Sequence, residues 1–183
     1  MSKKAAMHSK MAKAAGWAPG PWHDEPDKLE FKAHGMHCMI ARANAGHLCG
    51  YVAVTTGHPL HPHSKRGKFA HRILVDALKQ RMAELRDKRS TEAIMVRCLV
   101  KYSKISVVPD ENLPSHEGIN YCFMDRKQRY WFGFDCGHLG DVCPRDVDSQ
   151  FPPQPTDVYR DIVYVKRVCK KLACKLAKIG GAL

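Results

Sequence analysis

Two aromatic and apolar runs separated by five polar positions constrain the fold of this chain most strongly. Residues 119–124 and 130–134 are rich in the aromatic and branched side chains typical of strands. Residues 125–129 between them are polar and have the length of a hairpin loop. The sequence therefore predicts two antiparallel strands joined by a short turn.

Other periodic segments extend this prediction to a whole domain. Further strands are expected at 48–54, 94–100 and 105–108, and a basic amphipathic helix at 71–88. A second helix is expected at 157–179, where apolar residues recur at steps of three and four: Ile162, Val165, Cys169, Leu172 and Leu176. The prediction is an α+β fold, with a small antiparallel sheet flanked by two or three helices, in a single domain spanning residues 29–183.

The first 28 residues differ in character from this domain. Four lysines precede the first acidic residue, and prolines at positions 19, 21 and 26 interrupt any helix begun by the alanines. Residues 1–28 are therefore predicted to form a flexible basic arm. This arm is equally compatible with two interpretations: it contacts nucleic-acid phosphates, or it is simply a solvated chain terminus.

The charge balance favours an anionic partner. The chain has 183 residues and a formal net charge of +12, and residues 65–101 hold eleven Lys or Arg against four acidic residues. Nucleic acid or another polyanion is the expected partner, although a solvated charged face would have the same composition. No apolar stretch approaches the roughly 20 residues that span a bilayer, so no membrane partner is expected.

The cysteines indicate the compartment. Eight are present, none in a C-x-x-C pair, and no secretory signal precedes them. The expectation is a cytoplasmic protein, in host cytoplasm if phage-encoded, with free thiols.

The residues best suited to chemistry follow the second strand of the predicted hairpin. Asp135, His138 and Asp141 lie on a glycine-rich turn, and His116 lies before the first strand, at the same open end of the hairpin. These four are the candidate catalytic residues, because a carboxylate can orient an imidazole as a general base and the set can bind a divalent metal. The alternatives are a tight turn, which also needs Asp and Gly, and a histidine satisfied by backbone groups.

Named motifs do not decide the reaction. His116-Glu117-Gly118 lacks the second histidine of a zinc-protease helix, and no zinc-deaminase, phosphate-loop or dinucleotide pattern is present. Three histidines from His58 to His63 alternate with prolines, which suits either a metal site or an exposed loop. The identity of any metal cofactor stays open.

Several segments together resemble a family of small proteins encoded by phages, prophages and other mobile elements. They are 49–52, 57–60, 116–119, 131–141, 159–161 and 164–165, within a resemblance that covers 48–63 and 115–172. The family pattern has glycine where this chain has Glu117. Four candidate ligand-binding residues lie in these segments: Tyr51, His58, Trp131 and Arg160.

These observations lead to three functional hypotheses. The first is a phage- or mobile-element-encoded accessory protein that acts as a metal-assisted hydrolase of a phosphate-containing substrate, either nucleotide or nucleic acid. The second is a non-catalytic nucleic-acid or nucleotide-binding protein. The third is a virion or host-takeover protein that acts through a protein partner.

Overall fold

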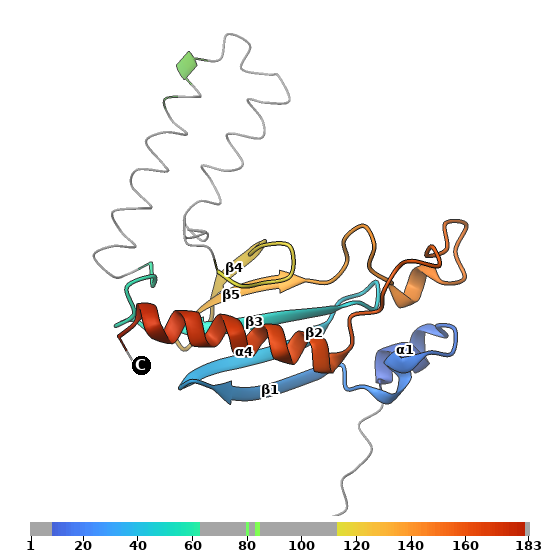
Figure 1. Ribbon diagram of the computed structural model, residues 1–183, viewed down its shortest axis with the longest axis horizontal. Coiled ribbons are helices and arrows are strands. Elements are labelled where there is room, and N and C mark those ends of the chain that lie inside the picture. Colours follow the sequence, from blue (N-terminus) through green and yellow to red (C-terminus); the bar gives the residue numbers. More distant parts are fainter. Residues whose placement is uncertain (1–8, 63–79, 81–82, 85–112, 182–183) are drawn as a thin grey trace, which may run out of the picture.

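The computed structural model describes residues 9–62, 80, 83–84 and 113–181, which form an α+β fold around a five-stranded antiparallel sheet (Figure 1). The strand order is β1-β2-β3-β5-β4. The strands are β1 (Lys28–Ala33), β2 (Met36–Arg42), β3 (Leu48–Val54), β4 (Tyr121–Met124) and β5 (Tyr130–Asp135). The helical elements are α1 (Lys10–Ala15), η1 (Pro21–Asp24), η2 (Pro144–Asp146) and α4 (Ile162–Ile179).

The predicted hairpin and the strand at 48–54 are confirmed. β4 and β5 pair antiparallel, with Cys122 opposite Phe132. β5 also pairs with β3, which places Cys49 opposite Asp135. The sheet therefore brings the end of β5 next to the start of β3, although these strands are distant in the sequence.

The β1–β2 hairpin was not predicted. Its first strand alternates charged and apolar residues, which is the pattern of a half-buried strand, but it begins where the basic arm was expected to end. The two strands turn at His34 and Gly35, which both have positive φ values of 49° and 75°. These left-handed positions match the twist of a two-residue hairpin turn.

Helix α4 packs along one face of the sheet, where it crosses β3 and β2 (Figure 1). Its apolar stripe meets buried residues of the central strands, and Val52, Phe132 and Leu172 are fully buried in this core. A Cβ added at Gly50 would lie 2.7 Å from Cys169 Sγ, so glycine lets the helix approach the sheet closely.

The predicted start of this helix, at residue 157, is wrong. The helix begins at Ile162, because the carboxylate of Asp161 accepts a hydrogen bond from Tyr164 N and caps the first turn. Asp157 instead accepts from Gln154 N at 2.8 Å and closes a preceding turn.

The predicted flexible arm also differs from the structure over residues 9–28. Ser9 caps α1, and the carboxylate of Asp27 accepts hydrogen bonds from Lys10 N at 2.8 Å and Met11 N at 3.0 Å. The guanidinium of Arg42 in β2 then holds Asp27 at 3.0 Å. These tertiary contacts hold the segment against the sheet, and no local sequence pattern predicts them. Residues 1–8 lie outside the described part of the chain.

Some predictions fall outside the described residues. The strands at 94–100 and 105–108 lie there, as does most of the helix at 71–88, of which only residues 80, 83 and 84 are described, all helical. No described helix combines the length and the apolar character needed to cross a membrane.

Candidate metal centre and adjoining pocket

His116 and Asp141 form the centre of the candidate site. Asp141 Oδ2 accepts a hydrogen bond from His116 Nε2 at 2.7 Å, and Asp141 Oδ1 accepts from Arg160 Nε at 2.8 Å. The other ring nitrogen of His116, Nδ1, lies 2.9 Å from the hydroxyl of Tyr164. The loop after β5, the segment before β4 and the start of α4 thus meet at one point.

The electrostatics of Asp141 follow from these contacts. Burial by itself raises the pKa of this carboxyl, but the hydrogen bonds from Arg160 and His116 outweigh it and hold the pKa below its ordinary value. Asp141 is therefore ionised at neutral pH, with its side chain only 2% exposed.

His138 completes a cluster of metal-ligand type. Its Nδ1 lies 3.7 Å from Asp135 Oδ1 and 3.8 Å from Asp141 Oδ2, and its ring centroid is 5.4 Å from that of His116. One donor atom from each of His116, His138 and Asp141 lies within 4.8 Å of the others. Within the described part of the chain, His138 Nδ1 is a buried polar atom with no hydrogen-bond partner.

This donor set fits a divalent transition metal. Two imidazoles and one carboxylate are ligands that zinc, iron and manganese share. Tyr164 on His116 and Arg160 on Asp141 occupy the outer positions that orient metal ligands in proteins. The cluster therefore has both an inner set of donors and partners that hold two of them in place.

Comparison of the chain with models of protein families, with curated proteins and with solved structures finds no match. Function must therefore be inferred from the side chains and their geometry.

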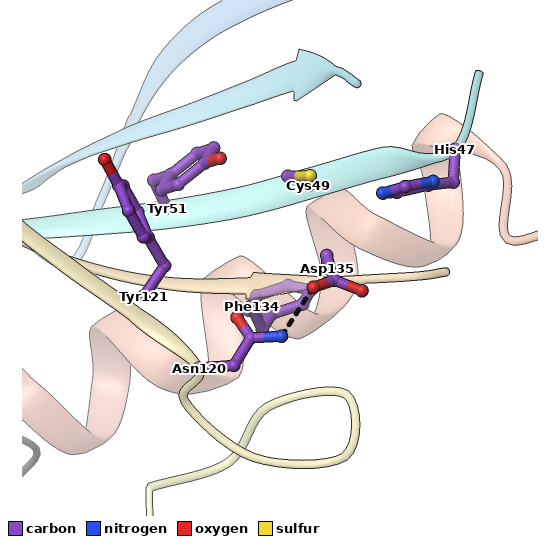
Figure 2. Close-up of a pocket in the computed structure, with 7 residues that line it drawn as sticks. All are labelled: His47, Cys49, Tyr51, Asn120, Tyr121, Phe134 and Asp135. Carbon is purple, nitrogen blue, oxygen red and sulfur yellow. Dashed lines mark hydrogen bonds between the residues drawn. The ribbon is translucent and has the colours of Figure 1, made fainter. Parts of the chain in front are cut away.

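Asp135 joins the cluster to a neighbouring pocket (Figure 2). One of its carboxylate oxygens accepts from Gly137 N at 3.0 Å and the other accepts from the amide of Asn120. The pocket has a volume of about 540 Å³ and lies on the sheet face opposite α4. It is lined by His47, Cys49, Tyr51, Asn120, Tyr121, Phe134 and Asp135.

The four predicted catalytic residues thus divide into two groups. His116, His138 and Asp141 supply the donor cluster, whereas Asp135 lies between that cluster and the pocket. Their expected proximity is observed.

The four predicted ligand-binding residues are not all brought together. Arg160 contacts Asp141, and Tyr51 lines the pocket. Trp131 is four residues from Asp135 along β5, about 13 Å at the rise of a strand, and donates to Asp125.

His58 lies far from the cluster. Its Nε2 lies 2.8 Å from the carbonyl of Leu176, twelve residues along α4 from Tyr164, which is about 18 Å of helix. Burial lowers the pKa of His58, and its Nδ1 accepts from Leu60 N at 3.1 Å. His58 and His61 are both buried and thus secure a packed segment in place of an exposed loop, whereas His63, the third histidine of this run, lies outside the described residues.

Several residues of the site are not among the predicted site residues: Tyr164 beside the cluster, and His47, Cys49, Asn120, Tyr121 and Phe134 in the pocket. Tyr164 falls only within a segment of the family resemblance, Asn120 stands where the family pattern has threonine, and no pattern in the sequence points to His47. His47 lies over Gly137, where an added Cβ would be 2.8 Å from its ring, and its Nδ1 is 3.5 Å from Cys143 Sγ. Only the pairing of β3 with β5 brings His47 to this place.

The described cysteines are free. Burial raises the pKa of Cys136 far above its ordinary value and that of Cys143 to about 11. Both thiols are therefore protonated at neutral pH, which makes them poor nucleophiles.

Proposed function

We propose that His116, His138 and Asp141 bind a divalent metal and that the protein is a metal-assisted hydrolase of a phosphate-containing substrate. The observation that carries this proposal is the buried Nδ1 of His138, which has no hydrogen-bond partner and faces two carboxylates. A buried polar atom left unpaired costs about 1–3 kcal/mol. A metal ion would satisfy this atom and offset the negative charge beside it.

The hydrogen bonds around the cluster support this assignment. On metal binding, His116 Nε2 would give up the proton that it donates to Asp141, and Nδ1–H would then donate a hydrogen bond to the Tyr164 hydroxyl, which leaves the Nε2 lone pair for the metal. Arg160 holds Asp141 through Oδ1 and leaves Oδ2 directed at both histidines. The donor atoms thus face one another before any ion enters.

In this proposal the pocket would hold the substrate, and Asp135 would act as the general base. A divalent ion held by the cluster would lower the pKa of a bound water and polarise a phosphoryl oxygen. Asp135 lies between the cluster and the pocket, and in this proposal it would accept the proton of an attacking water. The net charge of +12 favours the approach of an anionic substrate.

The resemblance to phage and mobile-element proteins supports a common role for these residues, because His116, Asp135, His138, Asp141 and Arg160 all lie in its segments. We therefore extend the proposal to an accessory protein of such an element. A non-catalytic nucleotide-binding protein is the second candidate, favoured by the aromatic lining of the pocket.

Metal titration tests the first part of the proposal. The protein should bind one equivalent of Zn²⁺ or Mn²⁺ by calorimetry, and His138→Gln and Asp141→Asn should each weaken binding by at least about tenfold. His34→Asn is the matched control, because His34 is exposed in the β1–β2 turn and asparagine tolerates its positive φ. Equal metal affinity in His138→Gln and His34→Asn would contradict the proposed site.

Turnover tests the second part. With metal bound, the protein should hydrolyse an activated phosphate ester, and Asp135→Asn should keep the metal but lose about a hundredfold in rate. Metal binding without any hydrolysis would favour the non-catalytic candidate.

A further inference from the structure

We infer that the pocket beside the cluster binds a nucleobase, so that the substrate of the proposed hydrolase is a nucleotide rather than another phosphate ester. The catalytic meaning of this inference rests on the proposed function, whereas the binding itself does not. Three features of the pocket carry it: the aromatic rings of two tyrosines, polar side chains beside them, and proximity to the cluster.

The walls are two tyrosine rings from different strands. The ring centroids of Tyr51 on β3 and Tyr121 on β4 lie 6.4 Å apart at an interplanar angle of 79°. Both flank the same end of the pocket in Figure 2. Tyr121 is 55% exposed, which leaves its ring available to a ligand. Every base has a π face, so such rings bind bases with little regard to sequence.

Gly133 keeps the Tyr51 ring in this position. A Cβ at Gly133 would lie 2.6 Å from Tyr51 Cδ1, so any larger residue would displace the ring from the sheet surface. Burial raises the pKa of Tyr51 above its ordinary value, so its hydroxyl stays protonated. Tyr51 therefore presents a neutral aromatic surface.

Three polar side chains, His47, Asn120 and Asp135, also line the pocket. Asn120 donates its amide to Asp135, which leaves the amide oxygen as an acceptor, and His47 stands at the opposite end from the tyrosines (Figure 2). Donors and acceptors beside aromatic faces suit the edge of a base. An aliphatic chain would leave these polar groups unpaired, and a bare sugar phosphate would leave the tyrosines uncovered.

The pocket also has the right size and place. Its volume of about 540 Å³ falls within the range of small-molecule sites. Asp135 belongs to the pocket, and its carboxylate lies 3.7 Å from His138 Nδ1. A base stacked on the exposed face of Tyr121 would therefore place an attached phosphate towards the donor cluster.

The aromatic surface continues beyond the pocket. Phe123 lies 5.5 Å from Tyr121 and stacks on Trp131 at 6.0 Å, and the Arg129 guanidinium covers the Trp131 ring at 4.9 Å. Trp131 is only 4% exposed beneath these two groups, so Phe123 is the next ring that a further base could contact. The base in the pocket can therefore belong to a free nucleotide or to a single strand whose next base contacts Phe123.

Calorimetry in excess chelator isolates the pocket from the metal. The four nucleoside monophosphates and ribose 5-phosphate are titrated into the protein and into Tyr121→Leu, Tyr121→Phe and Phe151→Leu. At least one nucleotide should bind about tenfold or more tightly than ribose 5-phosphate. Tyr121→Leu should weaken that binding about fivefold to a hundredfold, whereas Tyr121→Phe should preserve it. Phe151→Leu is the matched control, because Phe151 is 85% exposed and outside the pocket.

A short single-stranded oligonucleotide distinguishes the two sources. If the oligonucleotide binds more tightly than any mononucleotide, and Phe123→Leu removes that gain, the ligand is a single strand. If the oligonucleotide binds no more tightly than the best mononucleotide, the ligand is a free nucleotide. Equal binding of ribose 5-phosphate and nucleotides, or no loss in Tyr121→Leu, overturns the inference. Because chelator removes metal throughout, a failed metal titration leaves this result unaffected, and a failed nucleotide titration leaves the metal site standing.

Discussion

Glu117 occupies a backbone conformation that costs free energy. Its φ is 53°, in the left-handed region, and the next residue, Gly118, has φ 105°. A non-glycine residue in this region loses about 1 kcal/mol or more. The turn persists because it delivers His116 to Asp141, so strain is stored next to the candidate site.

Replacing this residue by glycine should relieve the strain. We expect Glu117→Gly to raise the midpoint of thermal unfolding by about 1–4 °C, since the greater flexibility of glycine in the unfolded chain offsets part of the gain. Metal affinity should be unchanged. Glu30→Gly in β1, where no left-handed backbone is required, should lower the midpoint instead. A fall of similar size in both variants would show that the Glu117 turn is unstrained.

At the scale of elements, Asp125 organises the β4–β5 hairpin. Its carboxylate accepts from Lys127 N at 2.8 Å, Arg129 N at 3.0 Å and Trp131 Nε1 at 3.0 Å. Burial raises the pKa of Asp125, but the hydrogen bonds from Trp131 and Arg129 outweigh it and lower the pKa to about 2. The hairpin turn is therefore stabilised by an ionised carboxylate.

This pKa predicts an acid-sensitive contribution to stability. Because the folded-state pKa lies below the unfolded value of 3.8, the contribution is complete above about pH 4 and is lost as pH falls towards 2. It should amount to about 1–2 kcal/mol after solvent screening. Urea unfolding from pH 6 down to about pH 2.5 should show this loss in the parent protein and much less of it in Asp125→Asn. Asp148→Asn, at an exposed loop position, should behave like the parent; identical pH profiles in all three proteins would refute the assignment.

Elements with a strong local pattern could be predicted from the sequence, and contacts between distant segments could not. The β4–β5 hairpin and the helix near the C-terminus have the right periodicity and capping residues within a few positions. The cluster could be anticipated for the same reason, since His116 and Asp135 flank a hairpin. His47 and Tyr164 reach the site through the β3–β5 pairing and the packing of α4, and His58 is removed from it by that same packing.

At the scale of the whole molecule, Arg42 connects three parts of the chain. Its side chain is fully buried and donates to Glu25 at 3.2 Å, Asp27 at 3.0 Å and the Tyr159 hydroxyl at 2.9 Å. Glu25 in turn accepts from Ile162 N at 2.7 Å. The N-terminal segment, β2 and the start of α4 are thus joined through one guanidinium.

Removing this guanidinium should leave two carboxylates without their cation. We expect Arg42→Met to lower the free energy of unfolding by about 3–5 kcal/mol, measured by urea denaturation. Arg145→Met is the matched control, because the Arg145 and Asp146 side chains are 60% and 39% exposed, and it should cost less than about 1 kcal/mol. Equal losses in the two variants would mean that the buried network adds no stability.

The pairing of β3 with β5 has a thermodynamic consequence for the pocket. The paired residues are roughly eighty positions apart, so pairing β3 with β5 costs about 2 kcal/mol more in chain entropy than closing a hairpin turn. The pocket lies across this pairing: the β3 side contributes His47, Cys49 and Tyr51, and the β4–β5 side contributes Asn120, Tyr121 and Asp135. The pocket therefore exists only while these two strands are paired, and by linkage a ligand bound there opposes their separation by an amount that grows with ligand concentration, about 2.7 kcal/mol at a hundred times the Kd.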